Sequence, residues 1–164
     1  MKRVLSLLVD DNPGVLSRIS GLFSRRCYNV DSITAGVTAD PRFTRITIVT
    51  SGDELILSQI EKQVRKLEDV VEIKVLAPEE SVFRELIMVK IRANAAQRSE
   101  VSAIADIFRA KVVDVSKDSL IVEMTGSKTK LEAFINLMGD YEILELARAG
   151  VMGLERGSHG VKFL

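Results

Sequence analysis

The segment Asp11-Asn12-Pro13-Gly14 has the residue types and spacing that could bind a small anion or zwitterion. An apolar, β-rich run over Val4–Val9 precedes it, and apolar residues recur at helical spacing from Val15, so the segment links a strand to a helix. The first N–H groups of a helix have no partner inside the helix and attract anions, and a glycine lets a carboxylate approach the backbone. The same residues also fit an ordinary turn and helix cap, and the spacing leaves both interpretations open. No G-x-G-x-x-G or G-K-S/T pattern follows, which excludes a dinucleotide or P-loop phosphate site.

Asn29, at the start of the next predicted strand, is a second candidate binding residue. Its amide offers a donor and an acceptor together, which suits a zwitterion, although an Asn after a helix also commonly forms a turn. Cys27 could be an activated thiol, but no base is close in the sequence, and a small packing residue is the simpler interpretation.

Catalytic chemistry has little support in this sequence. The single Cys27 and the single His159, which we assign no role, nearly exclude a zinc site or a Cys–His nucleophilic pair. Acidic pairs such as Asp10-Asp11 point to opposite faces of a strand and seldom converge. No nucleophile, base and orienting group can be combined, so we expect a chain without catalytic activity and without a metal.

The composition excludes several other classes of protein. Hydrophobic residues make up 46% and charged residues 28%, which is typical of a globular chain. The 23 basic and 23 acidic residues give no net charge, so the basic excess that nucleic-acid binding needs is absent. No apolar run approaches the roughly 18 residues of a membrane span. The first apolar run ends at Asp10-Asp11, too early for a signal peptide, and a chain with one thiol is expected in the cytoplasm.

Two successive βαββαβ patterns can be recognised along the chain. The first has strands over 4–9, 27–39, 43–51 and 70–76, a turn at 40–42, and helices that begin near residues 13 and 53. The second has strands over 85–92, 111–115, 120–125 and 141–149, with helices around 101–108 and 131–138. This order predicts an α+β protein of two tandem ferredoxin-like sandwiches. We expect domains at 1–77 and 83–164, a linker at 78–82, and a loosely ordered tail over 150–164.

The first predicted strand is apolar on both sides. Leu5, Leu7 and Val9 alternate with Val4 and Leu8, and one layer of helices cannot cover both faces of a sheet. We therefore expect self-association, edge to edge or face to face, into a homodimer.

The opening strand–DNPGVL–helix, followed by RRCYNVDSI in a βαββαβ unit, resembles the ACT domain, an amino-acid-sensing module. With further segments, the chain resembles the small regulatory subunit family of acetolactate (acetohydroxyacid) synthase over nearly its whole length. These segments are TRITIV, SQIEKQVRKLEDVVEI, RELIMVKI, IFRAKVVDVS, KLEAFINLM and LARAGVMGLERG.

The resemblance implies a non-catalytic chain that binds the catalytic (large) subunit of the synthase. It implies that this chain raises the activity of the catalytic subunit and confers feedback inhibition by valine, sometimes by leucine or isoleucine. Thiamine diphosphate, Mg²⁺ and FAD are expected in the catalytic subunit, and no cofactor is expected in this chain. The first unit would be an ACT domain that pairs into a homodimer with the effector at the interface.

The resemblance also implies site residues. Those expected to hold the amino and carboxylate groups of the effector are Asp11, Asn12, Pro13, Gly14 and Val15, and those expected to close the site from the partner subunit are Asn29 and Val30. Asp11 stands where the family usually has Asn; it attracts an ammonium and repels a carboxylate, so the effector's identity stays open. Cys27 stands where the family usually has Gly, which indicates that this turn does not require a positive φ.

Two other functions fit the predicted fold. One is a free-standing amino-acid-sensing ACT regulator. A transcription factor of that kind requires a helix-turn-helix and an excess of basic residues, and this sequence shows neither. The other is a small acylphosphatase-like hydrolase, which requires an arginine in a phosphate-binding loop. The first predicted helix opens on Asp11–Gly14 without that arginine.

Overall fold

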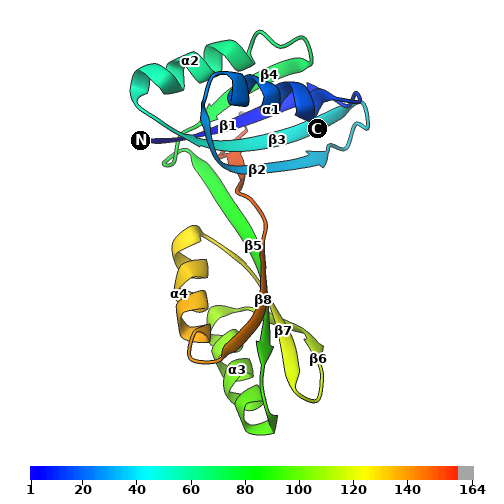
Figure 1. The fold of residues 1–164 in the computed structure, drawn as a ribbon, viewed down its shortest axis with the longest axis vertical. Helices are drawn as coiled ribbons and strands as arrows, with labels where there is room; N and C mark the ends of the chain where they lie inside the picture. The colour runs from blue at the N-terminus through cyan, green and yellow to red at the C-terminus, as the bar shows by residue number, and fades with distance from the viewer. Residues whose placement is uncertain (159–164) are drawn as a thin grey trace. The chain divides into compact units, whose positions relative to one another are not determined.

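The computed structural model describes residues 1–158 of the 164-residue chain, in two compact units (Figure 1). One unit is Met1–Phe83 together with the segment that starts at Val151, and the other is Arg84–Gly150. Among the described residues, no helix is both long and apolar enough to cross a membrane.

The first unit has the predicted βαββαβ order. Its elements are β1 (Lys2–Asp10), α1 (Val15–Arg25), β2 (Asn29–Val37), β3 (Phe43–Ser51), α2 (Glu54–Val64) and β4 (Val70–Leu76). The strands form an antiparallel sheet in the order β2-β3-β1-β4, and α1 and α2 lie on the same face of it (Figure 1). The predicted ferredoxin-like sandwich is confirmed.

The core of this unit lies between the sheet and its two helices. Alternate residues of β1 and β3 face the helices, and Leu5, Leu7 and Ile46 are completely buried there. Each such side chain contributes roughly 1.5–3 kcal/mol relative to an exposed position. On α2, Asp53 caps the helix by accepting a hydrogen bond from the backbone N–H of Ile56 at 2.8 Å, as its position before the apolar periodicity suggests.

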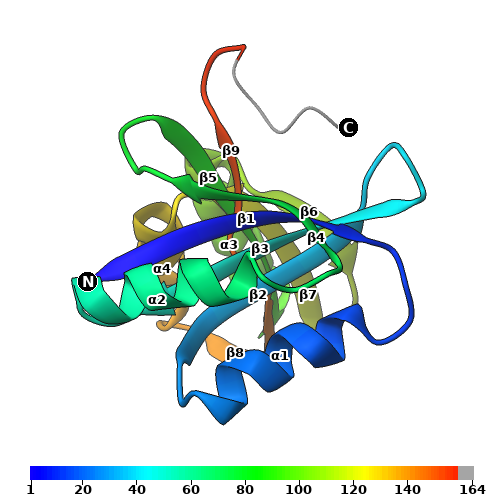
Figure 2. The same ribbon diagram turned by 90° about the horizontal axis from the view of Figure 1, so that it is seen from above.

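The opposite face of the sheet is also buried, and the same chain covers part of it. Leu8 points away from the helices yet is completely buried. Strand β9 (Met152–Glu155), which pairs with β5 (Ser81–Arg92), lies on this side (Figure 2). Several contacts hold it there: Val151 N–H donates to Ser32 Oγ at 2.9 Å, Glu155 pairs with Lys74, and Gly153 packs against Phe83 and Leu76.

Strand β9 bears on two expectations. Residues 150–164 were expected to form a loosely ordered tail, but 152–155 form a strand on the sheet of the first unit; residues 159–164, including His159, lie outside the described residues. Self-association was expected to cover the second face of the sheet. The chain's own C-terminal segment covers part of that face, and the homodimer stays a prediction.

The second unit repeats the element order. Beyond β5 it contains α3 (Ala95–Phe108), β6 (Lys111–Val115), β7 (Ser119–Gly126), α4 (Lys128–Met138) and β8 (Glu142–Arg148), with strand order β6-β7-β5-β8. Ile87, Val89 and Ile91 share the buried face of β5, as their alternation predicts. β5 begins at Ser81, inside the segment 78–82 that the sequence suggests as a linker.

Candidate functional site

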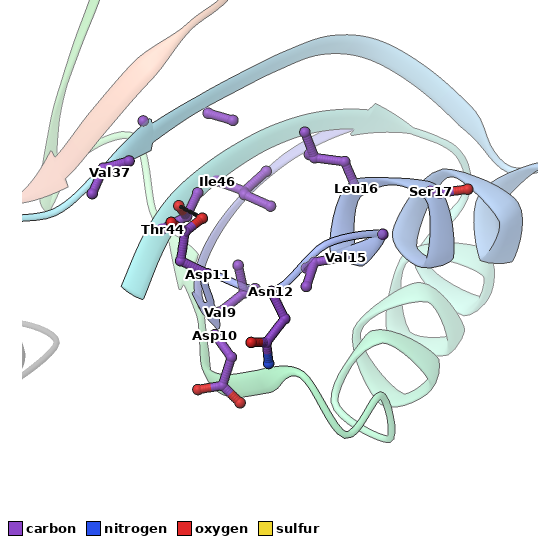
Figure 3. A pocket seen from close by; sticks show the side chains of 13 residues that line it. Val9, Asp10, Asp11, Asn12, Val15, Leu16, Ser17, Val37, Thr44 and Ile46 are labelled. Atoms are coloured by element: carbon purple, nitrogen blue, oxygen red, sulfur yellow. Dashed lines mark hydrogen bonds between the residues drawn. The ribbon is translucent and has the colours of Figure 1, made fainter. Parts of the chain in front are cut away.

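The turn between β1 and α1 is held by contacts to the β2–β3 hairpin. Asp11 N–H donates to the Arg42 carbonyl at 2.8 Å, and Asp11 Oδ1 accepts a hydrogen bond from Thr44 Oγ1 at 2.9 Å. Val15 N–H donates to the Asn12 carbonyl at 3.3 Å, which closes the turn. Figure 3 shows Asp11 beside Thr44, while Asp10 and Asn12 extend from the turn on the side away from Leu16. The turn is thus fixed in place, with its polar groups exposed.

Gly14 is the residue before the first turn of α1, with φ 88° and ψ −2°. This is the left-handed region, which glycine adopts without steric cost. No side chain caps the helix, and its first turn contains no acidic residue. Among the described residues, the N–H groups of Leu16 and Ser17 have no backbone or side-chain acceptor. The helix therefore presents free donors and a partial positive charge, which favour an anion.

A pocket of about 510 Å³ opens at this helix terminus (Figure 3). Its polar wall is the turn from Asp10 to Gly14, and Thr44 adds a hydroxyl. The other lining residues are mainly apolar: Val9, Val15, Leu16, Ala35, Val37 and Ile46. Leu16 is 49% exposed and Val37 62% exposed, so this apolar wall is open to solvent. The pocket suits a small molecule with a charged end and an aliphatic end.

The structure brings only some of the predicted site residues together. Asp11, Asn12, Gly14 and Val15 line the pocket, with Pro13 in the turn between them. Asn29 and Val30 lie at the other end of β2: Asn29 pairs with Ser51, whereas Val37 pairs with Thr44 beside the pocket. Ala35 is the pocket residue of β2 nearest to Asn29, and the six residue steps between them span about 20 Å. Asn29 and Val30 of the same chain therefore cannot contact a ligand in this pocket.

Strand β2 is an edge strand with an exposed apolar surface. Val30, Ile33 and Val37 are 41%, 45% and 62% exposed. The Asn29 amide donates to Asp31 and to Ser51 Oγ, the latter at 2.9 Å. An unpaired edge of this kind is a template for pairing with a second strand.

Arg18 lies beside Gly14, and the sequence analysis did not identify it. Its guanidinium donates two hydrogen bonds to Asp69, Nε to Oδ2 at 2.6 Å and Nη2 to Oδ1 at 2.8 Å, and these lower the pKa of Asp69. Nη1 of Arg18 lies 3.0 Å from where a Cβ on Gly14 would stand. A helical side chain covers the turn before its own Cα, so the position of Arg18 four residues after Gly14 was a usable signal. Its partner Asp69, 51 residues away, was not predictable from spacing.

Cys27 corrects another expectation, because its φ is 54°. Cys27 N–H donates to the Ser24 carbonyl at 3.1 Å and Tyr28 N–H to the Phe23 carbonyl at 2.9 Å, and the Tyr28 ring packs edge-on against that of Phe23. These two bonds form a Schellman motif, in which the residue after the helix cap is left-handed and usually Gly. The turn therefore does adopt a positive φ, and Cys27 bears a steric cost of about 1–2 kcal/mol that a glycine avoids. The thiol is free and exposed.

The stability of the β2–β3 hairpin, which supports the turn, should depend on pH through Asp40. Hydrogen bonds from Arg42 lower the pKa of Asp40 from its ordinary 3.8 to about 2. A depressed pKa means that the contribution to folding is complete above pH 3.8 and is lost as the pH falls toward 2. We expect a carboxyl ¹³C titration to place Asp40 near 2, and Arg42→Gln to return it toward 3.8 while leaving Asp69 unchanged. An Asp40 midpoint near 3.8 in the unmodified protein would contradict the pairing.

Metal binding has no candidate within residues 1–158. No group of three or more His, Cys, Asp or Glu side chains in that range is arranged to hold a metal ion.

Comparison with known protein families gives matches to both units. Residues 5–72 match a family model described as an AHAS small subunit-like ACT domain, and residues 84–157 match one described as the small subunit of acetolactate synthase.

Individual proteins match over nearly the full chain. The chain is 46% identical to a probable acetolactate synthase small subunit of Methanothermobacter thermautotrophicus, over 94% of this chain and 93% of that protein. It is 45% identical to the acetolactate synthase isozyme 3 small subunit of Escherichia coli, over 96% and 97%. The crystal structure of an acetolactate synthase small subunit from Thermotoga maritima superposes with a TM-score of 0.90 at 37% identity, covering 97% of this chain and 99% of that one.

Proposed function

Because the chain belongs to the family of acetolactate synthase small subunits, we propose that it activates the catalytic (large) subunit of that enzyme and makes it sensitive to feedback inhibition. Valine is the proposed effector, with leucine and isoleucine as alternatives of the same chemistry. The chain contributes no catalytic residue, and thiamine diphosphate, Mg²⁺ and FAD belong to the catalytic subunit. We place the assembly in the cytoplasm.

The observation that carries this proposal is the pocket at the uncapped N-terminus of α1. A branched-chain amino acid has a carboxylate for the free N–H groups of Leu16 and Ser17, and an ammonium for the carboxylate of Asp11. Its aliphatic side chain fits the apolar wall that includes Leu16 and Ile46. Asp11 Oδ1 already accepts from Thr44, so the other oxygen is available to the ammonium.

A homodimer through β2 completes the proposed site. If the β2 strands of two copies pair antiparallel, Asn29 and Val30 of one copy approach Gly36 and Val37 of the other, beside the pocket. The pairing also buries the exposed apolar side chains of the β2 edge, including Ile33. Asn29 then supplies an amide to the zwitterion from the partner copy.

Reconstitution tests the proposed function. We expect the purified chain to form no acetolactate from pyruvate, because it offers no catalytic set, and to raise the turnover of a catalytic subunit that carries its cofactors. Valine should then inhibit the reconstituted enzyme but not the catalytic subunit alone. Acetolactate formation by this chain alone would refute the regulatory assignment. Failure to bind or activate the catalytic subunit, with valine binding intact, would favour a free-standing amino-acid sensor.

A further inference from the structure

A second pocket lies on the face of the first unit's sheet that points away from α1 and α2. It has a volume of about 410 Å³ and is closed on one side by β9, through Met152, Gly153 and Leu154. Its other walls come from β2, β3 and the segment after β2: Thr34, Ala35, Gly36, Val37, Thr38, Ala39, Arg45 and Thr47. The volume is that of a small-molecule site, and the lining is apolar apart from Arg45 and three threonines.

Arg45 gives this pocket a positive charge that has no counter-ion among residues 1–158. It is partly buried, and Nη1 donates to Ser6 Oγ at 3.0 Å. No carboxylate of residues 1–158 forms an ion pair with it, whereas other arginines of the same unit, such as Arg18 and Arg42, are paired. A partly buried guanidinium gains most from an anion that it can bind with two hydrogen bonds.

Thr34 adds an unused hydroxyl. Its Oγ1 is buried and has no hydrogen-bond partner in the described part of the chain. The register places Thr34 and Gly36 on the same face of the sheet as Arg45, because Gly36 pairs with Arg45 and Thr34 with Thr47. A buried hydroxyl without a partner costs free energy that a bound acceptor would recover.

We propose that this pocket binds a small aliphatic carboxylate, with its carboxylate on Arg45 and its chain against Met152 and Leu154. The site is separate from the pocket at the N-terminus of α1, which lies on the helix side of the sheet. The two pockets share only the residues Ala35, Gly36 and Val37 at the end of β2. The inference does not depend on the proposed regulatory function, since binding can be measured on this chain alone.

Gly36 allows the pocket to be blocked without strain. A Cβ on Gly36 would meet no atom within 4 Å, and its φ is not in the left-handed region. Gly36→Leu therefore places a side chain in the pocket, while Arg45→Gln removes the charge and keeps a hydrogen-bond donor for Ser6. Arg65→Gln is the matched control, because Arg65 caps the C-terminal end of α2, outside the pocket, and pairs there with Glu61.

Calorimetry on the full chain tests the proposal with hexanoate as the probe and hexanamide as its uncharged analogue. We expect hexanoate to bind and hexanamide to bind at least about 10-fold more weakly. Arg45→Gln should weaken hexanoate binding about 10-fold or more, Gly36→Leu should abolish it, and Arg65→Gln and Gly14→Asp should leave it unchanged. Thermal melts confirm that each variant is folded.

The outcomes separate the possible ligands. Tighter binding of 2-oxohexanoate than of hexanoate would support a 2-oxo acid as ligand, with Thr34 as an added donor, and equal or weaker binding would support an unsubstituted fatty acid. No binding of either at about 10 mM would overturn the proposal. So would hexanoate binding that survives both Arg45→Gln and Gly36→Leu, or that disappears only in Gly14→Asp.

Discussion

Replacing Gly14 by Asp is expected to abolish inhibition by valine while activation of the catalytic subunit survives. The new carboxylate would stand at the terminus of α1, where the proposed effector places its own. Two unit charges about 4 Å apart repel by on the order of 4 kcal/mol at an effective dielectric of 20. Even half of that repulsion lowers the affinity about 30-fold.

Gly14→Asp should also lower the folding stability of the chain by a measurable amount. An Asp near a helix N-terminus is favourable by charge, which by itself predicts little loss of stability. Gly14, however, has φ 88°, and a Cβ there would stand 3.0 Å from Nη1 of Arg18. Left-handed backbone costs a residue with a side chain about 1–2 kcal/mol, somewhat less for Asp and Asn than for others.

Gly14→Asn is the control that isolates the charge. It carries the same backbone strain and nearly the same volume, but no negative charge, and should weaken valine inhibition much less than Gly14→Asp. Valine titrations of the reconstituted enzyme, with thermal melts of the three proteins, separate strain from repulsion. If Gly14→Asp is inhibited like the unmodified protein, the effector carboxylate is not held at this helix.

Two variants of this chain, each insensitive to valine on its own, are expected to restore valine inhibition when they are mixed. One carries Gly14→Asp and the other Asn29→Ala. Ala35, the nearest pocket residue of β2, lies about 20 Å along the strand from Asn29 of the same chain, so the proposed site combines Gly14 of one copy with Asn29 of the other. A heterodimer of the two variants then has one intact site and one site with both substitutions.

Random exchange of subunits makes about half of the dimers heterodimers, so about a quarter of the sites should bind valine. Each variant alone should bind none in the same concentration range. A chain carrying both substitutions, mixed with either single variant, provides no intact site and is the matched control. If the mixture of single variants stays unresponsive while the dimers exchange, the effector site does not lie across two copies.

Local pattern was enough to predict the turn and its helix. The apolar run over Val4–Val9, the break at Asp11–Gly14 and the helical periodicity from Val15 lie within about 20 residues. The backbone angles and hydrogen bonds of this turn and this helix are set by residues that are close in the sequence. The same is true of Asp53, whose capping bond reaches only three residues along the chain. Local pattern thus placed Asp11–Val15 at the start of a helix but left open whether the turn is a binding site or an ordinary cap. The family resemblance is what identified Asp11, Asn12, Gly14 and Val15 as site residues, and they line the pocket.

The backbone at Cys27 could not be predicted from its residue type. A cysteine in a turn suggests a negative φ, but the Schellman motif after α1 requires the left-handed region there. The hydrogen bonds of Cys27 and Tyr28 to the last turn of the helix outweigh the steric cost at one residue. Propensity describes the residue alone, whereas the motif depends on where the helix ends and where β2 begins.

Only the tertiary structure decided what lies against the two faces of the first unit's sheet. Sequence alternation shows that Leu8 needs cover but not what provides it. Part of the face on which Leu8 lies is covered by the C-terminal segment, whose contacts join Val151 to Ser32 and Glu155 to Lys74 across 119 and 81 residues. The pocket beside Arg45 exists because that segment lies there, and the edge of β2 stays open because strand order places it outermost. Such contacts depend on register and on which surfaces remain after the core has formed, and these are properties of the whole fold.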